Sequence, residues 1–327
     1  MDIPGFVDLQ VNGYRGTDFS APDLSEEALA AACRDLLARG TAALLPTIVS
    51  SPLEVYERNL PLAARVMARR EFAGRLLGLH LEGPFLSAEP GAVGAHNPAW
   101  VRPPDPGLLD RMWAWAEGRV RLLTIAAEAP GAEDLARRAV GLGITVSLGH
   151  HLADEAALDR LARAGATALT HLGNGVPNTL PRHRNPIWAG LAEDRLWAMI
   201  IADGHHLPPA VLKVILRAKG VARTAVVSDA SPVAGLPPGR YRVSGNDAVL
   251  EPSGLLHNPA KGCLVGSSAT LLECMNHLAS LGLCTAEELV ALGLDNPLHL
   301  VGLDRSALAA SPAVTFDERE RRFRLRG

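Results

Sequence analysis

The chain of 327 residues is 48% apolar and 20% charged. This composition favours a large buried core and excludes an intrinsically disordered protein. A formal net charge of -3, with no arginine-rich run before the C-terminal tail, excludes an electrostatic surface for nucleic acid. No apolar stretch reaches the roughly 20 residues that a membrane helix needs, and the first residues do not resemble a secretory signal. We therefore expect a cytoplasmic protein whose partners include neither nucleic acid nor a membrane.

Short apolar runs alternate with amphipathic helical patterns along most of the chain. In chain order, the expected elements are strand 6–11, helix 25–39, strands 42–49, 76–81 and 120–127, helix 132–142, strand 145–148, helix 155–164, strands 166–170 and 196–202, helix 208–219 and strand 224–228. Such alternation indicates a parallel sheet built from β/α units. Eight strands with intervening helices predict an α/β fold, a TIM-like (β/α)8 barrel, and the length of the chain fits such a barrel.

Two segments depart from the alternation. Residues 240–263 have the pattern of a β-hairpin with strands at 241–243 and 248–250. Residues 312–325 have the pattern of a second hairpin, after expected helices at 267–280 and 286–292. We interpret both hairpins as parts of a reduced β appendage. The expected division is a barrel over residues 1–303, with the insertion at about 240–263, and a C-terminal β remnant over residues 304–327.

Acidic and imidazole side chains follow five of the eight expected strands: Glu82, His150, His171, Asp203 with His206, and Asp229. In a β/α barrel these strand ends meet at one mouth, where catalytic groups lie. Each residue alone has a structural explanation, because an isolated histidine is more often a hydrogen-bonded structural residue and a carboxylate can cap a turn. Together they indicate a catalytic metal site, since two imidazoles and one carboxylate with an open fourth position hold zinc or a similar ion.

A set of short stretches is distinctive in its order along the chain. The most specific contains His80-Leu81-Glu82-Gly83-Pro84. The full set lies at residues 4–13, 79–85, 94–98, 147–150, 170–174, 201–206, 228–230 and 265–268. In this order the stretches resemble the N-acetylglucosamine-6-phosphate deacetylases of the amidohydrolase superfamily, from residue 4 to about residue 300.

The resemblance implies a role for each matching residue. It gives Glu82, His150 and His171 as metal ligands, Asp229 as the catalytic acid/base, His96 as the residue that polarises the acetyl carbonyl, and Asn174 and His206 as contacts to the sugar phosphate. Arg182 or Arg184 would reach the phosphate, in relatives from the partner subunit of a dimer. The implied partner is therefore a small N-acetyl amino-sugar phosphate, and a homodimer is compatible with this role.

The chemistry of these side chains agrees with the implied roles. A bound divalent ion lowers the pKa of a water molecule towards roughly 7. Asp229 can take a proton from that water during attack and return it to the departing amine. The ion and His96 together can stabilise the developing oxyanion.

Two features differ from related enzymes. Most amidohydrolases carry a His-x-His metal pair at the end of the first strand, where this chain has Gln10 and Asn12. Amides are poor ligands beside imidazoles, so we expect these second-metal positions to be lost and one divalent ion per chain, with zinc favoured over iron, cobalt or manganese. The family also has a β-sandwich formed partly by residues before the first strand. Only three residues precede Pro4, so we expect its N-terminal part to be missing.

The leading functional hypothesis is metal-dependent hydrolysis of an amide C–N bond, namely deacetylation of N-acetylglucosamine-6-phosphate or a similar sugar phosphate. Hydrolysis of a different amide or cyclic amide by the same site is a second hypothesis. The third is a catalytically inactive barrel that binds a sugar. Residues 174–187 depart from the family's usual arginine-proline-glycine ending, so the metal chemistry carries over better than the substrate.

Overall fold

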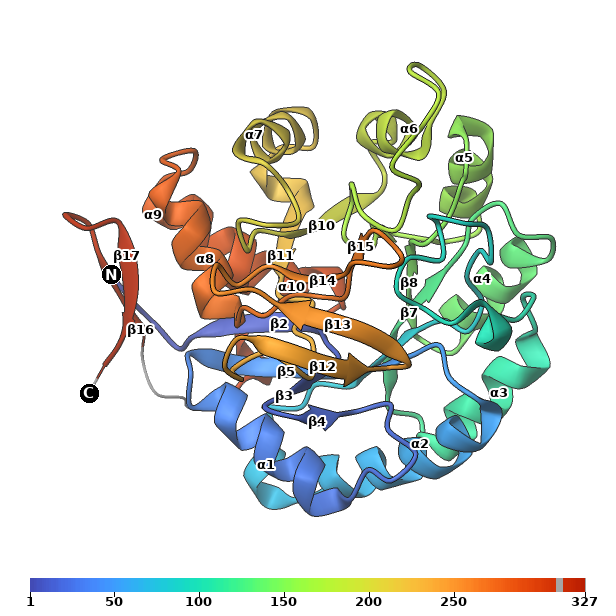
Figure 1. Ribbon diagram of the computed structural model, residues 1–327, viewed down its shortest axis with the longest axis horizontal. Coiled ribbons are helices and arrows are strands. Elements are labelled where there is room, and N and C mark those ends of the chain that lie inside the picture. Colours follow the sequence, from blue (N-terminus) through green and yellow to red (C-terminus); the bar gives the residue numbers. More distant parts are fainter. Residues whose placement is uncertain (310–313, 327) are drawn as a thin grey trace.

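The structure is a computed structural model that describes residues 1–309 and 314–326. Within these residues, eight parallel strands follow one another around a barrel in chain order (Figure 1). They are β2 (Phe6–Val11), β5 (Thr41–Val49), β6 (Leu79–Glu82), β7 (Val120–Ile125), β8 (Thr145–Leu148), β9 (Ala168–Leu169), β10 (Trp197–Ile201) and β11 (Thr224–Val227). The barrel closes where Val11 pairs in parallel with Ala230, just beyond β11. The expected (β/α)8 fold class is confirmed.

The barrel strands are buried on both faces, which explains why their sequences are continuous apolar runs rather than alternating ones. Five strands are shorter than expected, namely those predicted at 76–81, 120–127, 166–170, 196–202 and 224–228, and two of them differ in an informative way. The strand expected at 166–170 is reduced to β9, because the chain turns out of the sheet at Thr170 and His171. The strand expected at 76–81 begins only at Leu79, and Leu76 makes an isolated bridge to Leu44.

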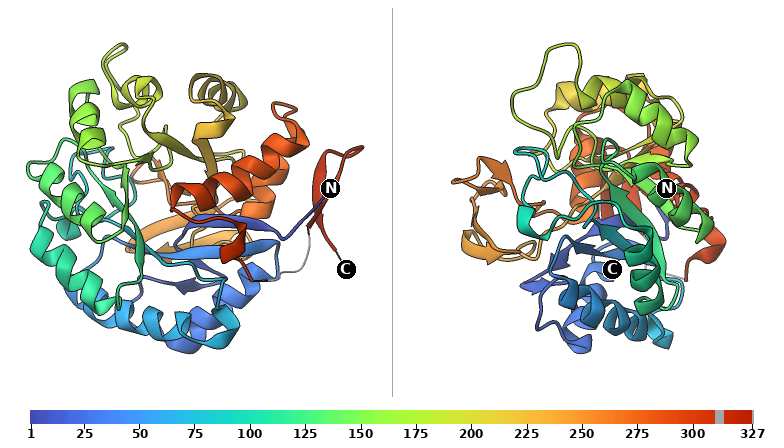
Figure 2. Two further views of the ribbon diagram at one scale, coloured as in Figure 1. Left: turned by 180° about the vertical axis from the view of Figure 1, so that it is seen from behind. Right: turned by 90° about the vertical axis from the view of Figure 1, so that its right-hand side faces the viewer.

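Helices surround the barrel, as Figure 2 shows from behind. They are α1 (Glu26–Leu37), α2 (Leu53–Met67), α3 (Pro106–Trp115), α4 (Ala132–Gly141), α5 (Glu155–Arg163), α6 (Pro186–Ala192), α7 (Pro209–Ala218), α8 (Leu271–Ser280), α9 (Ala286–Val290) and α10 (Asn296–Leu300). Ala291–Asp295 form a π-helical turn between α9 and α10. Side-chain caps begin several helices: Ser25 accepts a hydrogen bond from the Ala28 amide at 3.2 Å, and Asp154 accepts one from the Ala157 amide at 2.8 Å.

An antiparallel sheet, here called the insertion sheet (residues 239–264), lies across the barrel mouth and projects from one face of the barrel (Figure 2, right). It contains β12 (Gly239–Val243), β13 (Asn246–Leu250), β14 (Leu256–Asn258) and β15 (Cys263–Leu264). The expected hairpin is therefore present as β12 and β13, but the sequence prediction missed β14 and β15. These two strands, of three and two residues, are too short to give an alternating pattern.

Two further small antiparallel pairings lie outside the barrel. β3 (Gly13–Tyr14) pairs with β4 (Thr17–Asp18) directly after β2. β1 (Asp2–Ile3), β16 (Val314–Asp317) and β17 (Arg322–Leu325) form a sheet at the side of the barrel, in the order β1-β16-β17.

The β1-β16-β17 sheet packs against the barrel and α8. The Phe323 and Phe6 rings meet edge to face at 4.9 Å, and Asn276 of α8 both donates to and accepts from the backbone of Phe323. Of the hairpin expected at 312–325, residues 312 and 313 lie outside the described part of the chain. Among residues 1–309 and 314–326, no helix combines the length and the apolar character needed to cross a bilayer.

Candidate metal centre and active site

Four of the sequence-predicted site residues lie at the carboxyl ends of barrel strands. Glu82 is the last residue of β6, and His150, His171 and Asp229 each lie two residues beyond the end of β8, β9 and β11. The last three have positive φ angles of 51°, 30° and 51°, a left-handed conformation that is uncommon outside glycine. Each strand thus leaves the sheet through a sharp turn, and the turn aims the side chain across the mouth of the barrel. Such conformations cluster at functional sites.

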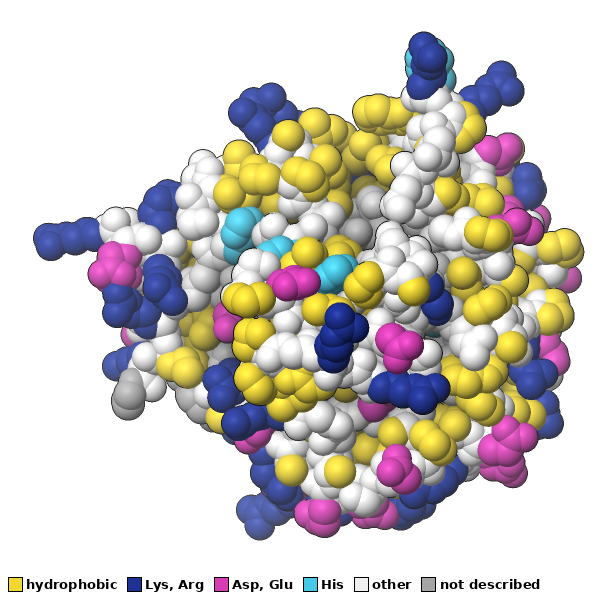
Figure 3. All heavy atoms as spheres, viewed as in Figure 1, with side chains coloured by type: hydrophobic (Ala, Val, Ile, Leu, Met, Phe, Trp, Pro, Cys, Tyr) yellow, Lys and Arg dark blue, Asp and Glu magenta, His cyan; other side chains and the backbone are white. Residues whose placement is uncertain are grey.

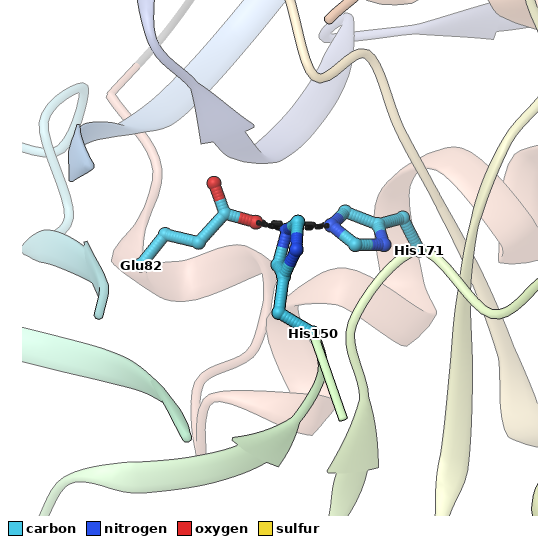
Figure 4. Close-up of side chains that lie close together, drawn as sticks. All are labelled: Glu82, His150 and His171. Atoms are coloured by element: carbon cyan, nitrogen blue, oxygen red, sulfur yellow. Dashed lines mark hydrogen bonds and ion pairs between the residues drawn. The ribbon is translucent and has the colours of Figure 1, made fainter. Parts of the chain in front are cut away.

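Glu82, His150 and His171 converge on one point (Figure 4). Glu82 Oε1 lies 3.0 Å from His171 Nε2 and 3.4 Å from His150 Nε2, and the two imidazole nitrogens are 3.1 Å apart. Ligand atoms about 2.0–2.1 Å from a tetrahedral ion lie roughly 3.3 Å from one another. The separations of these three atoms therefore fit one small divalent cation, with a fourth position open.

The second nitrogen of His150 fixes how its ring is used. His150 Nδ1 lies 2.8 Å from the carbonyl oxygen of Ala92, so Nδ1 carries the proton and donates it. The lone pair of His150 Nε2 is then free to face Glu82 and His171. A backbone carbonyl that orients a histidine ligand in this way is a common feature of metal sites.

The electrostatics of the three ligands favour the charged carboxylate. All three are buried, and burial alone would raise the pKa of Glu82. The adjacent His150 and His171 side chains outweigh burial and lower that pKa well below its ordinary value. For His171, burial opposes charge, but the neighbouring Glu82 carboxylate raises its pKa overall. A negative oxygen beside two imidazole nitrogens is a donor set suited to a cation.

Gln10 and Asn12 lie beside the carboxylates instead of completing a second set of imidazole ligands. Gln10 Nε2 donates to Glu82 Oε1 at 2.7 Å and to Asp229 Oδ1 at 3.0 Å. Asn12 Nδ2 donates to the same Asp229 oxygen at 2.7 Å. The two amides therefore hold Glu82 and Asp229 in place through hydrogen bonds.

Asp229 shares the Gln10 amide nitrogen with Glu82 and is 8% exposed. Burial, reinforced by the negative charge of Glu82, raises the pKa of Asp229 to about 6, although His171, His206 and Asn12 act in the opposite direction. A carboxyl group with a pKa near neutrality can both accept and return a proton at physiological pH.

His96 approaches the metal ligands from the segment after β6. Its Nε2 lies 3.7 Å from Glu82 Oε2, and its ring meets the ring of His150 edge to face at 4.4 Å. Burial, assisted by the nearby His150, lowers the pKa of His96 to about 3, so the ring is neutral near pH 7. A neutral imidazole keeps one N–H that can donate to an acyl oxygen.

A cavity of about 690 Å³ contains the site. Its lining includes Asn12, Glu82, His96, His150, His171, Asn174, His206 and Asp229, together with Asn246 and other residues of the insertion sheet. No lysine or arginine appears among the described residues that line this cavity. Arg182 and Arg184 are exposed instead, on the segment before α6, which projects from the barrel and carries basic side chains at its tip (Figures 1 and 3). The structure thus brings together every sequence-predicted site residue except these two arginines.

Asp203 is a site residue to which sequence reasoning gave no role. Its Oδ2 accepts a hydrogen bond from His206 Nδ1 at 2.8 Å, and its Oδ1 accepts from the His205 and His206 amides at 2.9 Å. Burial disfavours the charged carboxylate, but His206 and these amides lower the pKa of Asp203 well below its ordinary value. His206 lines the cavity, and Asp203 holds its ring from behind through Nδ1. The three-residue spacing of Asp203 and His206 in one turn was the signal that could have revealed it.

Characterised proteins are similar to this chain in sequence and in fold. No family model matches this chain. The N-acetylglucosamine-6-phosphate deacetylase of Bos taurus is 37% identical over 316 residues, which cover 92% of this chain and 75% of the relative. The N-acetylgalactosamine-6-phosphate deacetylase of Escherichia coli O157:H7 is 29% identical and covers 92% of this chain and 78% of its own.

The structural comparison agrees. A Mycobacterium smegmatis N-acetyl-D-glucosamine-6-phosphate deacetylase, solved in complex with N-acetyl-D-glucosamine-6-phosphate, superimposes with a TM-score of 0.88 at 29% identity, over 98% of this chain and 84% of that one. The corresponding enzyme of Thermotoga maritima gives a TM-score of 0.85 at 26% identity, over 98% and 85% of the two chains. This chain therefore belongs to the N-acetylglucosamine-6-phosphate deacetylase family of metal-dependent amidohydrolases.

Proposed function

We propose that this protein removes the acetyl group from N-acetylglucosamine-6-phosphate, releasing acetate and the free amino-sugar phosphate. The observation that carries the proposal is the convergence of Glu82, His150 and His171 with Asp229 in one cavity. Membership of the family supports the substrate class. The E. coli relative, named for galactosamine, makes N-acetylgalactosamine-6-phosphate the closest alternative substrate.

The residues present fit one divalent ion held by Glu82, His150 and His171, and we propose zinc, with iron, cobalt and manganese as alternatives. Their donor atoms are 3.0–3.4 Å apart, and Ala92 fixes the tautomer of His150. When bound, the ion supplies Lewis acidity that polarises an acyl oxygen and lowers the pKa of water. We propose that Gln10 and Asn12 limit the chain to this one ion.

Asp229 is the proposed acid/base. Held by Gln10 and Asn12, its carboxylate takes a proton from the attacking water and then donates it to the nitrogen of the departing amine. This second transfer matters because an unprotonated amine is a poor leaving group. His96 is neutral and lies beside Glu82, where its N–H can stabilise the negative charge that develops on the acetyl oxygen.

His206 and Asn174 are the proposed contacts to the sugar phosphate. Both line the cavity, and Asp203 holds the ring of His206. A phosphate dianion also needs cationic donors, and arginine supplies a planar pair of them. Because Arg182 and Arg184 are exposed and do not line the cavity of their own chain, we propose that one of them reaches the phosphate in a second copy of the chain.

Organisation and location are also proposals. We propose a barrel over residues 1–303 and a small β unit over 304–327 that is the remnant of a sandwich, to which β1 at the start of the barrel segment adds a strand. We propose a cytoplasmic location, which fits a phosphorylated substrate and the free cysteines Cys33, Cys263, Cys274 and Cys284.

Acetate release is the direct test. Protein reconstituted with zinc is offered N-acetylglucosamine-6-phosphate, N-acetylgalactosamine-6-phosphate and unphosphorylated N-acetylglucosamine, with the Glu82→Gln variant as the control. We expect release from a phosphorylated sugar and its loss in the variant. Turnover of the unphosphorylated sugar at an equal rate would exclude the phosphate assignment. If no sugar releases acetate but a parallel assay shows hydrolysis of a cyclic amide, a different amidohydrolase is favoured. No turnover in either assay would favour a sugar-binding barrel.

A further inference from the structure

The insertion sheet has a small hydrophobic core of its own, and the segment that carries His96 is part of it. The core comprises Val243, Ala248, Leu250 and Leu256 of the sheet with the flanking Val233 and Val265, and Ala95 packs against it. Ala95 is the neighbour of His96 and belongs to the loop of residues 87–97, here called the His96 loop. The insertion sheet thus contacts the loop directly beside a proposed catalytic residue.

Asn246 makes the polar part of this contact. Its side chain, 1% exposed at the start of β13, donates from Nδ2 to the carbonyl oxygen of Ala95 at 2.7 Å. Asn246 Oδ1 accepts from Asn258 Nδ2 at 3.2 Å. Asn258 is 4% exposed, and its own Oδ1 accepts the Ala260 and Lys261 amides. Two buried asparagines therefore form a hydrogen-bonded chain that ends on the peptide group between Ala95 and His96.

The His96 loop is folded through turns and contains no helix or strand. It contains two glycines with positive φ, Gly91 at 87° and Gly94 at 56°, so its backbone is held by short turns. The His96 amide donates to Val93 O at 3.1 Å within one of these turns. The same loop supplies Ala92 O to the metal ligand His150. Asn246 adds a contact from outside the loop at the residue next to His96.

We propose that Asn246, supported by Asn258, is a positioning residue that holds His96 against the catalytic site through the carbonyl of Ala95. The catalytic part of this inference rests on the proposed function, but the structural part does not. A misplacement of about 1 Å in a catalytic group can lower turnover roughly 100-fold. The insertion sheet is then a component of the active site, which it supports as well as covers.

Asn246 also lines the cavity, so a direct contact to substrate is the competing explanation. Two features separate the explanations. Asn258 is not among the described residues that line the cavity, so an effect of Asn258 on the site reaches it through neighbours such as Asn246 and not through a contact to substrate. Moreover, a residue that acts by positioning His96 has no effect on turnover once His96 has been removed, whereas a residue that binds substrate directly keeps its effect.

The first experiment measures hydrogen exchange without substrate, in native protein and in the Asn246→Leu, Asn258→Ala and Ser268→Ala variants. Ser268 Oγ donates to Gly254 O at 2.6 Å and so also anchors the insertion sheet, but at the turn between β13 and β14 and not at the His96 loop, which makes Ser268→Ala the matched control. We expect the Gly94 and His96 amides to exchange at least about tenfold faster in Asn246→Leu, by a smaller factor in Asn258→Ala, and at the native rate in Ser268→Ala. Unchanged exchange in both asparagine variants would overturn the inference.

The second experiment is a double-mutant cycle on acetate release. We expect Asn246→Leu to lower kcat about 10- to 100-fold with a nearly native KM, and to have no further effect in a His96→Ala background. Multiplicative effects, or a rise in KM alone, would show direct substrate binding and overturn the inference. If Asn246→Leu does not fold, Asn258→Ala takes its place in the cycle. If native protein releases no acetate, the proposed function fails while the exchange experiment still decides whether Asn246 holds the loop.

Discussion

The side-chain amide of Gln10 donates a hydrogen bond to Glu82 Oε1 at 2.7 Å. The same amide nitrogen lies 3.0 Å from Asp229 Oδ1, so one donor joins a proposed metal ligand to the proposed acid/base. Such a donor stabilises both carboxylates in their ionised form. It also occupies the place from which an imidazole would bind a second ion.

This arrangement predicts how many metal ions each chain binds. We expect protein reconstituted with zinc to hold about one ion per chain, because the amides of Gln10 and Asn12 are poor ligands beside His150 and His171. Elemental analysis after removal of free metal measures the ratio. The Glu82→Gln variant should fall well below one. A stable ratio near two in native protein would contradict the assignment of Gln10 and Asn12.

Replacement of Asp229 by asparagine should abolish most turnover. The variant keeps the size of the side chain but cannot accept a proton, so we expect kcat to fall at least about 100-fold. Zinc content should change little, because the donors of Glu82, His150 and His171 remain. Steady-state kinetics with parallel metal analysis measures both quantities. Near-native turnover in Asp229→Asn would eliminate the proposed mechanism.

Asp203 should act through His206. Asparagine at position 203 keeps one acceptor oxygen but removes the charge that faces His206 Nδ1. We expect KM for the sugar phosphate to rise about tenfold, with a smaller effect on kcat, as is typical when the partner of a functional histidine is changed. The Asp203→Asn change should add little in a His206→Ala background. If the two effects multiply instead, Asp203 has a separate role.

The phosphate assignment predicts an effect of arginine that depends on the substrate. We expect Arg182→Ala or Arg184→Ala to raise KM for the phosphorylated sugar strongly while zinc content is unchanged. Slow turnover of the unphosphorylated sugar should respond little to the same change. If the arginine acts in a second copy, mixing Arg→Ala protein with Asp229→Asn protein should restore sites that contain both native residues. Equal effects on both sugars would remove the phosphate from the proposal.

Asp8 gives a prediction about stability that does not depend on activity. Burial, partly offset by hydrogen bonds from Ser228 and Gln10, raises the pKa of Asp8 from 3.8 to about 7. The folded protein therefore binds this proton more tightly than the unfolded chain does. The charged carboxylate destabilises the fold increasingly as pH rises from about 4 to about 7, and fully above that range.

Asparagine at position 8 keeps an acceptor for the Ser228 and Gln10 amides and carries no charge. The free energy of unfolding of Asp8→Asn should therefore increase relative to native protein as pH rises from 4 to 8, measured by urea denaturation at each pH. A difference that does not change with pH would show that Asp8 has an ordinary pKa in the fold.

Much of the barrel could be predicted from sequence, because its strands are short apolar runs separated by amphipathic helical patterns. The strands expected at 6–11 and 145–148 have the bounds of β2 and β8. The convergence of Glu82, His150 and His171 was also predictable, since parallel strands carry their carboxyl ends to one edge. The apolar pattern of the sequence could not reveal how the loops contact one another above the carboxyl ends of the strands.

Asn246 illustrates the limit. It follows Ser244 and Gly245, so in sequence it resembles a turn residue, and nothing local indicates that its side chain is buried against Ala95, 151 residues away. Arg182 and Arg184 show the opposite limit. Their position in sequence suggested the active site, but their side chains face solvent in a single chain.

The left-handed backbone of His150, His171 and Asp229 has a consequence for protein engineering. At each of these positions, the native side chain lowers the free energy of unfolding by about 1–3 kcal/mol relative to a residue that adopts this conformation readily. Glycine and asparagine are the residues that do so. A directed-evolution campaign that screens only for heat resistance should therefore enrich asparagine or glycine at these three codons and discard the reaction centre. Libraries intended to yield a more robust enzyme need all three codons fixed, with the search confined to residues whose backbone is unstrained.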